Sequence, residues 1–176
     1  MASQGNELKA FKVLPIVIDF QPSVQLKVTY GSSEVVNGVA LRPEGTQEPP
    51  KVIISGHVEK DAKYTLVVTD PDAPSPDDPK FAEFLHWIVA NIPGSEAAEE
   101  KDISHAGEEL MPYTGPAPPM GVHRYIFILF KQSQDLSKEA APEDRKLFKV
   151  RQWAEEHGLT PVGIVFFTAE KGGNRN

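Results

Sequence analysis

The sequence predicts a mostly β protein of the α+β class, folded as one domain over residues 1–176. Short runs rich in β-branched and aromatic residues recur along the chain, and several are apolar at every position, as in strands covered on both faces. Only one segment, near the C-terminus, has the spacing of an amphipathic helix. A chain of 176 residues fits a single domain, since domains usually run to roughly 100–200 residues.

Strands are predicted from two patterns. Val24–Tyr30 alternates apolar and polar residues, which is typical of a half-buried strand. Val35–Leu41 is a second candidate, interrupted by Asn37-Gly38, a dipeptide typical of a turn or bulge. Short apolar runs predict five more strands: Val52–Ile54, Tyr64–Thr69, Leu85–Ile92, Tyr125–Phe130 and Val162–Thr168.

One helix is predicted over Pro142–His157. Proline suits a first helical position, acidic residues follow it in the first turn, and Gly158 stands where a helix would end. Pro93–Gly121 is predicted to be a long connection. Residues 1–10 and 170–176 are expected to be flexible tails.

The composition excludes several classes of function. The absence of cysteine excludes thiolate nucleophiles, iron–sulfur clusters and cysteine-bound zinc. A net charge of -7 argues against direct binding to nucleic acid, because phosphate backbones attract basic surfaces. No apolar stretch approaches the ~20 residues of a membrane helix, and no signal peptide is recognised. We therefore expect a cytoplasmic protein, with the nucleus as a second location. The sequence is unusually rich in proline, with 16 residues of this type.

The first candidate site is the segment DPDAPSP, which follows the strand Tyr64–Thr69. Proline pushes the residue before it toward extended geometry, so this loop is stiff and can hold the carboxylates of Asp70 and Asp72 in fixed positions. The alternative is that both aspartates only cap turns. In an alternating strand, His86 shares a face with Ile88, and a lone histidine there is usually a satisfied core residue.

The second candidate site is GPAPPMGVHRY, another proline-rich loop that runs into a strand. Alternation places His123 and Tyr125 on one face and Arg124 on the other. If the two loops meet, an aspartate orients a histidine ring, and the other ring nitrogen and the Tyr125 hydroxyl are left to bind an anion.

These motifs resemble the two signature regions of the phosphatidylethanolamine-binding protein family, and the resemblance runs from about residue 16 to residue 169. The flanking segments are most similar to the plant branch of flowering and germination regulators, nearest to the mother-of-FT-and-TFL-like members. The resemblance implies a large central antiparallel sheet flanked by a smaller sheet, with a few peripheral helices. It also implies cis peptide bonds at Ala73-Pro74 and near Ala82-Glu83, and a monomer.

The family further implies a small pocket for phosphate or phospholipid head groups. Its residues here would be Asp70, Asp72, Pro74, Phe84, His86, Gly115, Pro118, Pro119, His123 and Tyr125. Phe84 stands where flowering promoters have Tyr and repressors have His, so neither role is indicated. Asp61 and Asp135 replace the basic residues with which promoters bind 14-3-3 proteins, which argues against that partner and its bZIP complexes.

Three functions compete. The favoured one is a non-catalytic regulator with an anion pocket that recognises phospholipid head groups or phosphorylated partners and makes peripheral membrane contact at most. The second is a structural or interaction module, for example an inhibitor of a kinase or protease. The third is a metal-dependent or acid–base enzyme built on Asp70, Asp72, His86 and His123. No GxSxG, Walker, HExxH or SxxK pattern supports an enzyme, and no cofactor or metal is expected.

Overall fold

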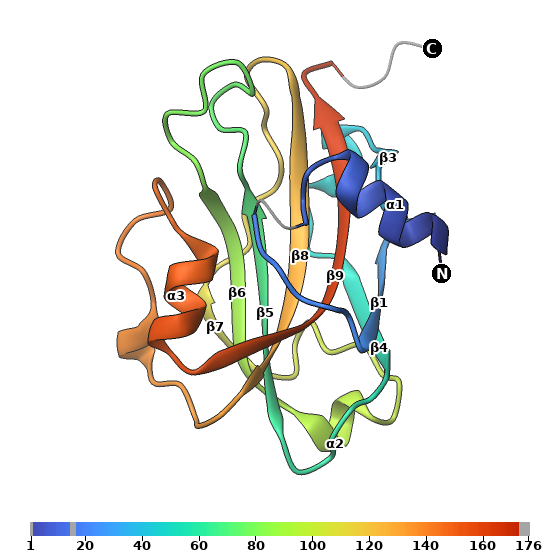
Figure 1. Cartoon of the computed structure of the whole chain (residues 1–176), viewed down its shortest axis with the longest axis vertical. Helices are drawn as coiled ribbons and strands as arrows, with labels where there is room; N and C mark the ends of the chain where they lie inside the picture. The colour runs from blue at the N-terminus through green and yellow to red at the C-terminus, as the bar shows by residue number, and fades with distance from the viewer. Residues whose placement is uncertain (1, 15–16, 173–176) are drawn as a thin grey trace.

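The computed structural model describes residues 2–14 and 17–172 and contains two β-sheets (Figure 1). The small sheet has the strand order β2-β1-β4, and the large sheet has the order β3-β9-β8-β5-β6-β7. All pairs are antiparallel except β3 with β9. The strands are β1 (Val24–Tyr30), β2 (Ser33–Glu34), β3 (Val39–Ala40), β4 (Lys51–Gly56), β5 (Lys63–Asp70), β6 (Phe84–Pro93), β7 (Glu108–Met111), β8 (Val122–Gln132) and β9 (Leu159–Glu170).

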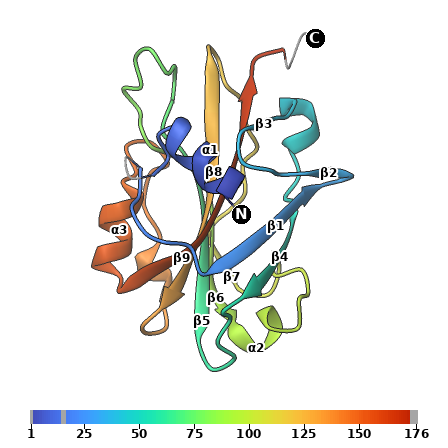
Figure 2. The ribbon, with the colours of Figure 1, turned by 45° about the vertical axis from the view of Figure 1, so that its right-hand side comes forward.

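The large sheet is covered on both faces. Figure 2 shows α1 (Ala2–Ala10) and α3 (Val150–Glu156) on one side of it and the small sheet on the other. One apolar cluster packs Leu8, Val150 and Trp153 against the first face, and a second packs Val28 and Ile54 of the small sheet against the opposite face. The central strands β5, β6 and β8 are therefore buried on both sides, which explains their continuous apolar runs.

The predicted fold class is confirmed, and so is each predicted strand of the two sheets except one. Val35–Leu41 is divided by a turn at Asn37-Gly38, and only Val39–Ala40 within it is strand. The predicted long connection over 93–121 contains the short helix α2 (Gly94–Ala97) and strand β7, which pairs with β6. Two 3-10 helices, η1 (Pro43–Thr46) and η2 (Lys138–Ala140), complete the elements of the described residues.

The helix predicted over Pro142–His157 is wrong in its first half, because α3 begins only at Val150. The main-chain N–H groups of Leu147 and Phe148 donate across the loop to the carbonyls of Phe81 and Glu83 instead of along a helix. Leu147 also has a φ of 62°, which is incompatible with a right-handed helix. These bonds hold the segment before α3 to the residues that directly precede β6.

The N-terminal residues that were expected to form a tail contain a helix. Residues 2–10 form α1, and Leu8 is buried in the first apolar cluster. At the other end, β9 runs to Glu170, and residues 173–176 of the expected C-terminal tail lie outside the described residues. Within the described chain no helix is long and apolar enough to cross a membrane.

Candidate functional site: a buried cluster at the end of the large sheet

Asp70 and His123 meet at one end of the large sheet. Asp70 is the last residue of β5, and His123 is the second residue of β8, the strand that pairs with β5. His123 Nδ1 lies 2.7 Å from Asp70 Oδ2, and both side chains are almost fully buried. The two proline-rich loops therefore meet, and Asp70 orients the ring of His123.

Both ring nitrogens of His123 face acceptors, since Nε2 lies 2.9 Å from the main-chain oxygen of Met120. Burial alone would lower the pKa of His123. The hydrogen bond to Asp70 and the charge of that carboxylate outweigh burial, so the pKa is raised above its ordinary value. His123 is thus an imidazolium that donates from both nitrogens. The expectation of a second nitrogen free for a ligand is wrong for this histidine.

Asp72 is paired with Arg124. Its Oδ2 accepts from the Arg124 main-chain N–H at 2.8 Å and from Nε at 2.9 Å, and its Oδ1 accepts from Nη2 at 2.8 Å. Two-pronged pairing of this kind is among the strongest charge-assisted hydrogen bonding. The Asp72 N–H in turn donates to Asp70 Oδ1 at 2.7 Å. The two carboxylates are therefore both neutralised and linked.

A β-bulge turns His86 toward this cluster. The pairing of β6 with β5 steps from Val68 opposite Trp87 to Thr69 opposite Leu85, so His86 has no partner in β5. The predicted shared face with Ile88 is wrong: Ile88 packs in the first apolar cluster, whereas the His86 ring contacts Tyr125 of the second, with ring centroids 5.2 Å apart.

The proton of His86 sits on Nδ1, which lies 2.7 Å from the main-chain oxygen of Thr114. Burial lowers the pKa of His86, and the charges of Arg145 and His123 lower it further, while the Thr114 carbonyl and Asp70 oppose them. His86 is therefore neutral near pH 7. Within the described chain Nε2 has no hydrogen-bond partner.

Tyr125 shares a face with His123, as alternation predicts, and the two rings stack with centroids 6.2 Å apart. Tyr125 is buried, and its hydroxyl has no hydrogen-bond partner among the residues that the structure describes. Burial and the nearby charges of Asp70 and Asp72 raise its pKa, so the hydroxyl stays protonated. The Phe84 ring also contacts the His86 ring, with centroids 5.1 Å apart.

The remaining predicted residues belong to the surrounding loops. Gly115 lies against Gln47, Pro118 is buried, Pro74 is half-buried, and Pro119 is exposed. The loops themselves touch where a Cβ on Gly121 would come within 2.6 Å of the Pro76 ring. The Ala73-Pro74 and Ala82-Glu83 peptide bonds are both cis.

Three contributors were not singled out by the sequence. Arg124 was placed on the correct face, but its pairing with Asp72 was not foreseen, although both stand inside the motifs. Thr114 acts through its main-chain oxygen, which no side-chain pattern reveals. Arg145 donates to the carbonyls of Leu85, His86 and Pro112, and it lies in the segment that was predicted to be helical.

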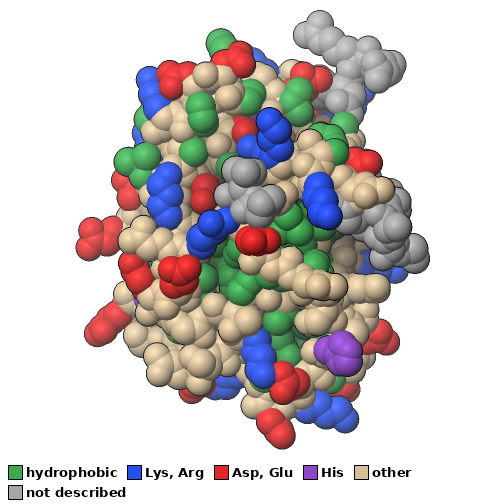
Figure 3. All heavy atoms as spheres, viewed as in Figure 1, with side chains coloured by type: hydrophobic (Ala, Val, Ile, Leu, Met, Phe, Trp, Pro, Cys, Tyr) green, Lys and Arg blue, Asp and Glu red, His purple; other side chains and the backbone are tan. Residues whose placement is uncertain are grey.

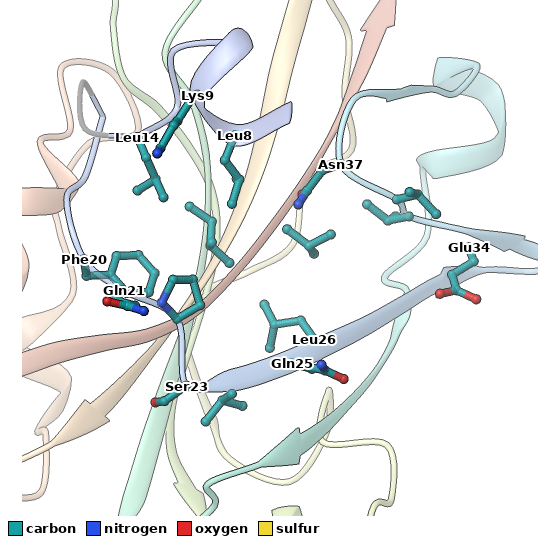
Figure 4. A pocket seen from close by; sticks show the side chains of 16 residues that line it. Leu8, Lys9, Leu14, Phe20, Gln21, Ser23, Gln25, Leu26, Glu34 and Asn37 are labelled. Carbon is teal, nitrogen blue, oxygen red and sulfur yellow. The ribbon is translucent and has the colours of Figure 1, made fainter. Parts of the chain in front are cut away.

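A separate hollow of about 840 Å³ lies away from this cluster, between the N-terminal segment and β1 (Figure 4). Its wall includes Leu8 and Leu14 on one side and Leu26 on the other, and β9 crosses beneath. On the face drawn in Figure 3, hydrophobic side chains gather near the centre among charges of both signs. Nowhere in the described part of the chain do three His, Cys, Asp or Glu residues form a group suited to hold a metal ion.

The fold and the cluster define a class of small two-sheet proteins with a buried polar site at one end of the large sheet. A family model described as phosphatidylethanolamine-binding protein matches residues 19–167. The chain belongs to the phosphatidylethanolamine-binding protein family, which confirms the resemblance in the sequence.

Plant proteins are among its relatives. "Protein MOTHER of FT and TFL1 homolog 2" of Oryza sativa subsp. japonica is 41% identical over 175 residues, covering 97% of this chain and 96% of the relative. "Protein FLOWERING LOCUS T" of Arabidopsis thaliana is 41% identical over 164 residues, covering 91% and 88%. Among solved structures, a carboxypeptidase Y inhibitor complexed with its cognate proteinase has a TM-score of 0.84 at 30% identity, covering 96% of this chain and 95% of that one.

Proposed function

We propose that this chain is a non-catalytic regulatory protein of plant development whose small site binds phosphate-containing ligands and which acts through protein partners. The names of its plant relatives support the developmental role, and the family description supports a phosphorylated ligand. Phospholipid head groups and phosphorylated proteins share the chemistry that the site would recognise. Cytoplasm and nucleus are the proposed locations, and a monomer is the proposed state.

One observation carries the proposal: the two polar groups of the cluster that lack a partner among the described residues belong to adjacent rings. These are His86 Nε2 and the Tyr125 hydroxyl, on rings with centroids 5.2 Å apart. Both atoms reach solvent, because Ser104 Oγ is the one fully enclosed side-chain oxygen or nitrogen without a hydrogen-bond partner in the described chain, so a ligand can reach them. A protonated tyrosine donates to a phosphate oxygen, and His86 Nε2 accepts from a phosphate O–H or donates once it is protonated.

The charges of the cluster are compatible with an anion. Two aspartates alone would repel phosphate, but Asp70 is paired with the His123 imidazolium and Asp72 with the Arg124 guanidinium. The pairs leave no net negative charge beside His86 and Tyr125. A local site of this kind can bind an anion although the whole protein carries a charge of -7.

The same geometry disfavours catalysis. The raised pKa of Tyr125 keeps its hydroxyl a donor rather than a nucleophile, and both nitrogens of His123 are already engaged. A protease-inhibitor module is the second candidate, because the inhibitor of carboxypeptidase Y shares this fold over nearly its full length. That role would use a surface rather than the buried rings.

Calorimetric titration with o-phosphorylethanolamine tests the proposal. We expect His86→Leu and Tyr125→Phe each to weaken binding by about tenfold or more, the value of a hydrogen bond to a charged group. His157→Leu is the matched control, since His157 Nδ1 also bonds a main-chain oxygen, that of Trp153, away from the cluster. Tyr64→Phe is the control for Tyr125. Equal affinity in wild type and His86→Leu would contradict the proposal.

A further inference from the structure

Arg124 connects the anion site to the N-terminal segment. While Nε and Nη2 hold the Asp72 carboxylate, Nη1 donates to the main-chain oxygen of Phe11 at 2.8 Å. Phe11 directly follows α1 and begins the turn after it, and it is 113 positions from Arg124 along the chain. The three donors of one guanidinium thus join two parts of the molecule.

The Phe11 carbonyl is fixed by packing in the protein interior. The Phe11 ring makes an edge-to-face contact with Phe166 of β9, with centroids 5.1 Å apart. Gly38 leaves room for that ring, since a Cβ at position 38 would lie 3.0 Å from a Phe11 ring carbon. Leu8, one turn earlier, is buried in the first cluster. The acceptor for Arg124 therefore depends on the docking of the whole segment.

Asp72 is close enough to the proposed anion site for its charge to affect binding there. Its carboxylate is one of the charges that raise the pKa of His123 and of Tyr125. Only about 5% of Asp72 is exposed, so an unpaired charge there would be poorly screened by solvent. Within the described chain, the one cation paired with Asp72 is Arg124. An anion at His86 and Tyr125 would meet an uncompensated aspartate if that pairing were lost.

We propose that Arg124 is the positioning residue that lets the site accept an anion, and that the N-terminal segment holds Arg124 on Asp72 through the carbonyl of Phe11. This inference rests on the proposed anion site. It makes the docked N-terminal segment a determinant of ligand affinity, although the segment itself supplies no ligand group.

A double-mutant cycle of Arg124 and Asp72 tests the role of Arg124. We expect Arg124→Gln to weaken o-phosphorylethanolamine binding by about tenfold, because Asp72 is left buried and negative. Asp72→Asn should bind as tightly as wild type or more tightly, because it removes the repelling charge. The double variant should return to within about threefold of wild type. A purely structural role predicts that the double variant binds at least as weakly as Arg124→Gln, and that result would overturn the inference.

A pair of variants tests the N-terminal segment. Phe11→Ala removes the ring whose packing holds the Phe11 carbonyl in place. Leu14→Ala serves as the control, because Leu14 lies in the same segment and is also half-buried. We expect Phe11→Ala to weaken binding about two- to fivefold in the wild-type background and to have no effect in Asp72→Asn. Equal losses in the two alanine variants would overturn this part.

The titration of His123, followed by NMR, gives a readout that needs no ligand. The groups that face His123 are the carboxylates of Asp70 and Asp72, the Met120 carbonyl, the Tyr125 ring and the His86 ring. Unpairing Asp72 in Arg124→Gln should raise the pKa of His123 further, and Asp72→Asn should lower it. An unchanged pKa in Arg124→Gln would overturn the inference even if phosphate binds. Failure of wild type to bind phosphate, with these shifts present, would overturn only the proposed function.

Discussion

Asp70 and His123, 53 positions apart in the chain, form a buried ion pair 2.7 Å long at the end of the large sheet. The pair is the anchor of the cluster: it fixes the His123 ring, joins Asp72 through a main-chain hydrogen bond, and holds β5 to the start of β8. The charge state of this pair therefore bears on both stability and ligand binding.

Asp70→Asn is expected to lower the pKa of His123, because burial then acts without the carboxylate. A histidine with a raised folded pKa adds stability that is present below its unfolded pKa and is lost as the pH rises through the folded pKa. The variant should therefore lose about 2–4 kcal/mol of unfolding free energy at pH 6, and less at high pH. Urea unfolding at several pH values measures this difference. A loss that is independent of pH would show that His123 is not charged.

Glu83 gives the same direction of pH dependence, but through a carboxyl group that burial keeps protonated. Burial raises its pKa from 4.5 to about 7, against the hydrogen bonds from Thr69 and from the Val150 N–H. The folded state then holds this proton more tightly than the unfolded state, so stability falls as the pH rises from about 4.5 to 7. The free energy of unfolding of Glu83→Gln should exceed that of wild type by up to about 3 kcal/mol at pH 8 and by almost nothing at pH 4. A constant difference between the two proteins across this range would contradict the assignment.

Gly121 keeps the two proline-rich loops in contact. It has a φ of +76°, and an added Cβ would lie 2.6 Å from the Pro76 ring. Gly121→Ala should cost about 1–3 kcal/mol of stability and weaken phosphate binding, because the loops must separate. Gly31→Ala is the control, since Gly31 also has a positive φ of +60° but no atom within 4 Å of its Cβ position. Thermal unfolding of both variants separates the clash from the backbone strain.

Anion affinity should rise as the pH falls. The pKa of His86 is lowered in the free protein, and a bound anion favours its protonated form. Sulfate is the suitable probe, because its own charge is constant over the range from about pH 5.5 to 8. We expect the sulfate affinity to increase by up to about tenfold per pH unit and the slope to vanish in His86→Leu. A flat profile in wild type would mean that His86 stays neutral on binding.

Much of the fold followed from local patterns. Val24–Tyr30 was predicted with its observed bounds because one face of β1 is buried and the other is exposed. Continuous apolar runs predicted the central residues of β5, β6, β8 and β9, because strands covered on both faces are apolar at every position. The prediction of a helix in the residues before α3 was wrong. The N–H groups of Leu147 and Phe148 have partners 60 or more positions away in the chain, and a local sequence pattern cannot reveal such distant partners.

The sequence predicted residues of the candidate site but not how their charges are paired. Alternation placed His123 and Tyr125 on one face of β8 correctly, since that strand is regular there. It failed for His86, because the bulge arises from pairing with β5 and leaves no mark in the β6 sequence. The pairing of Asp72 with Arg124 depends on where two loops meet, so sequence spacing alone could not assign it.

A crystal structure with o-phosphorylethanolamine would show whether an anion binds between His86 Nε2 and the Tyr125 hydroxyl. We expect phosphate oxygens within about 2.6–3.2 Å of both atoms, with the Asp70–His123 and Asp72–Arg124 pairs intact. A phosphate bound elsewhere, or a site that stays without phosphate at saturating ligand while both groups remain unpartnered, would contradict it.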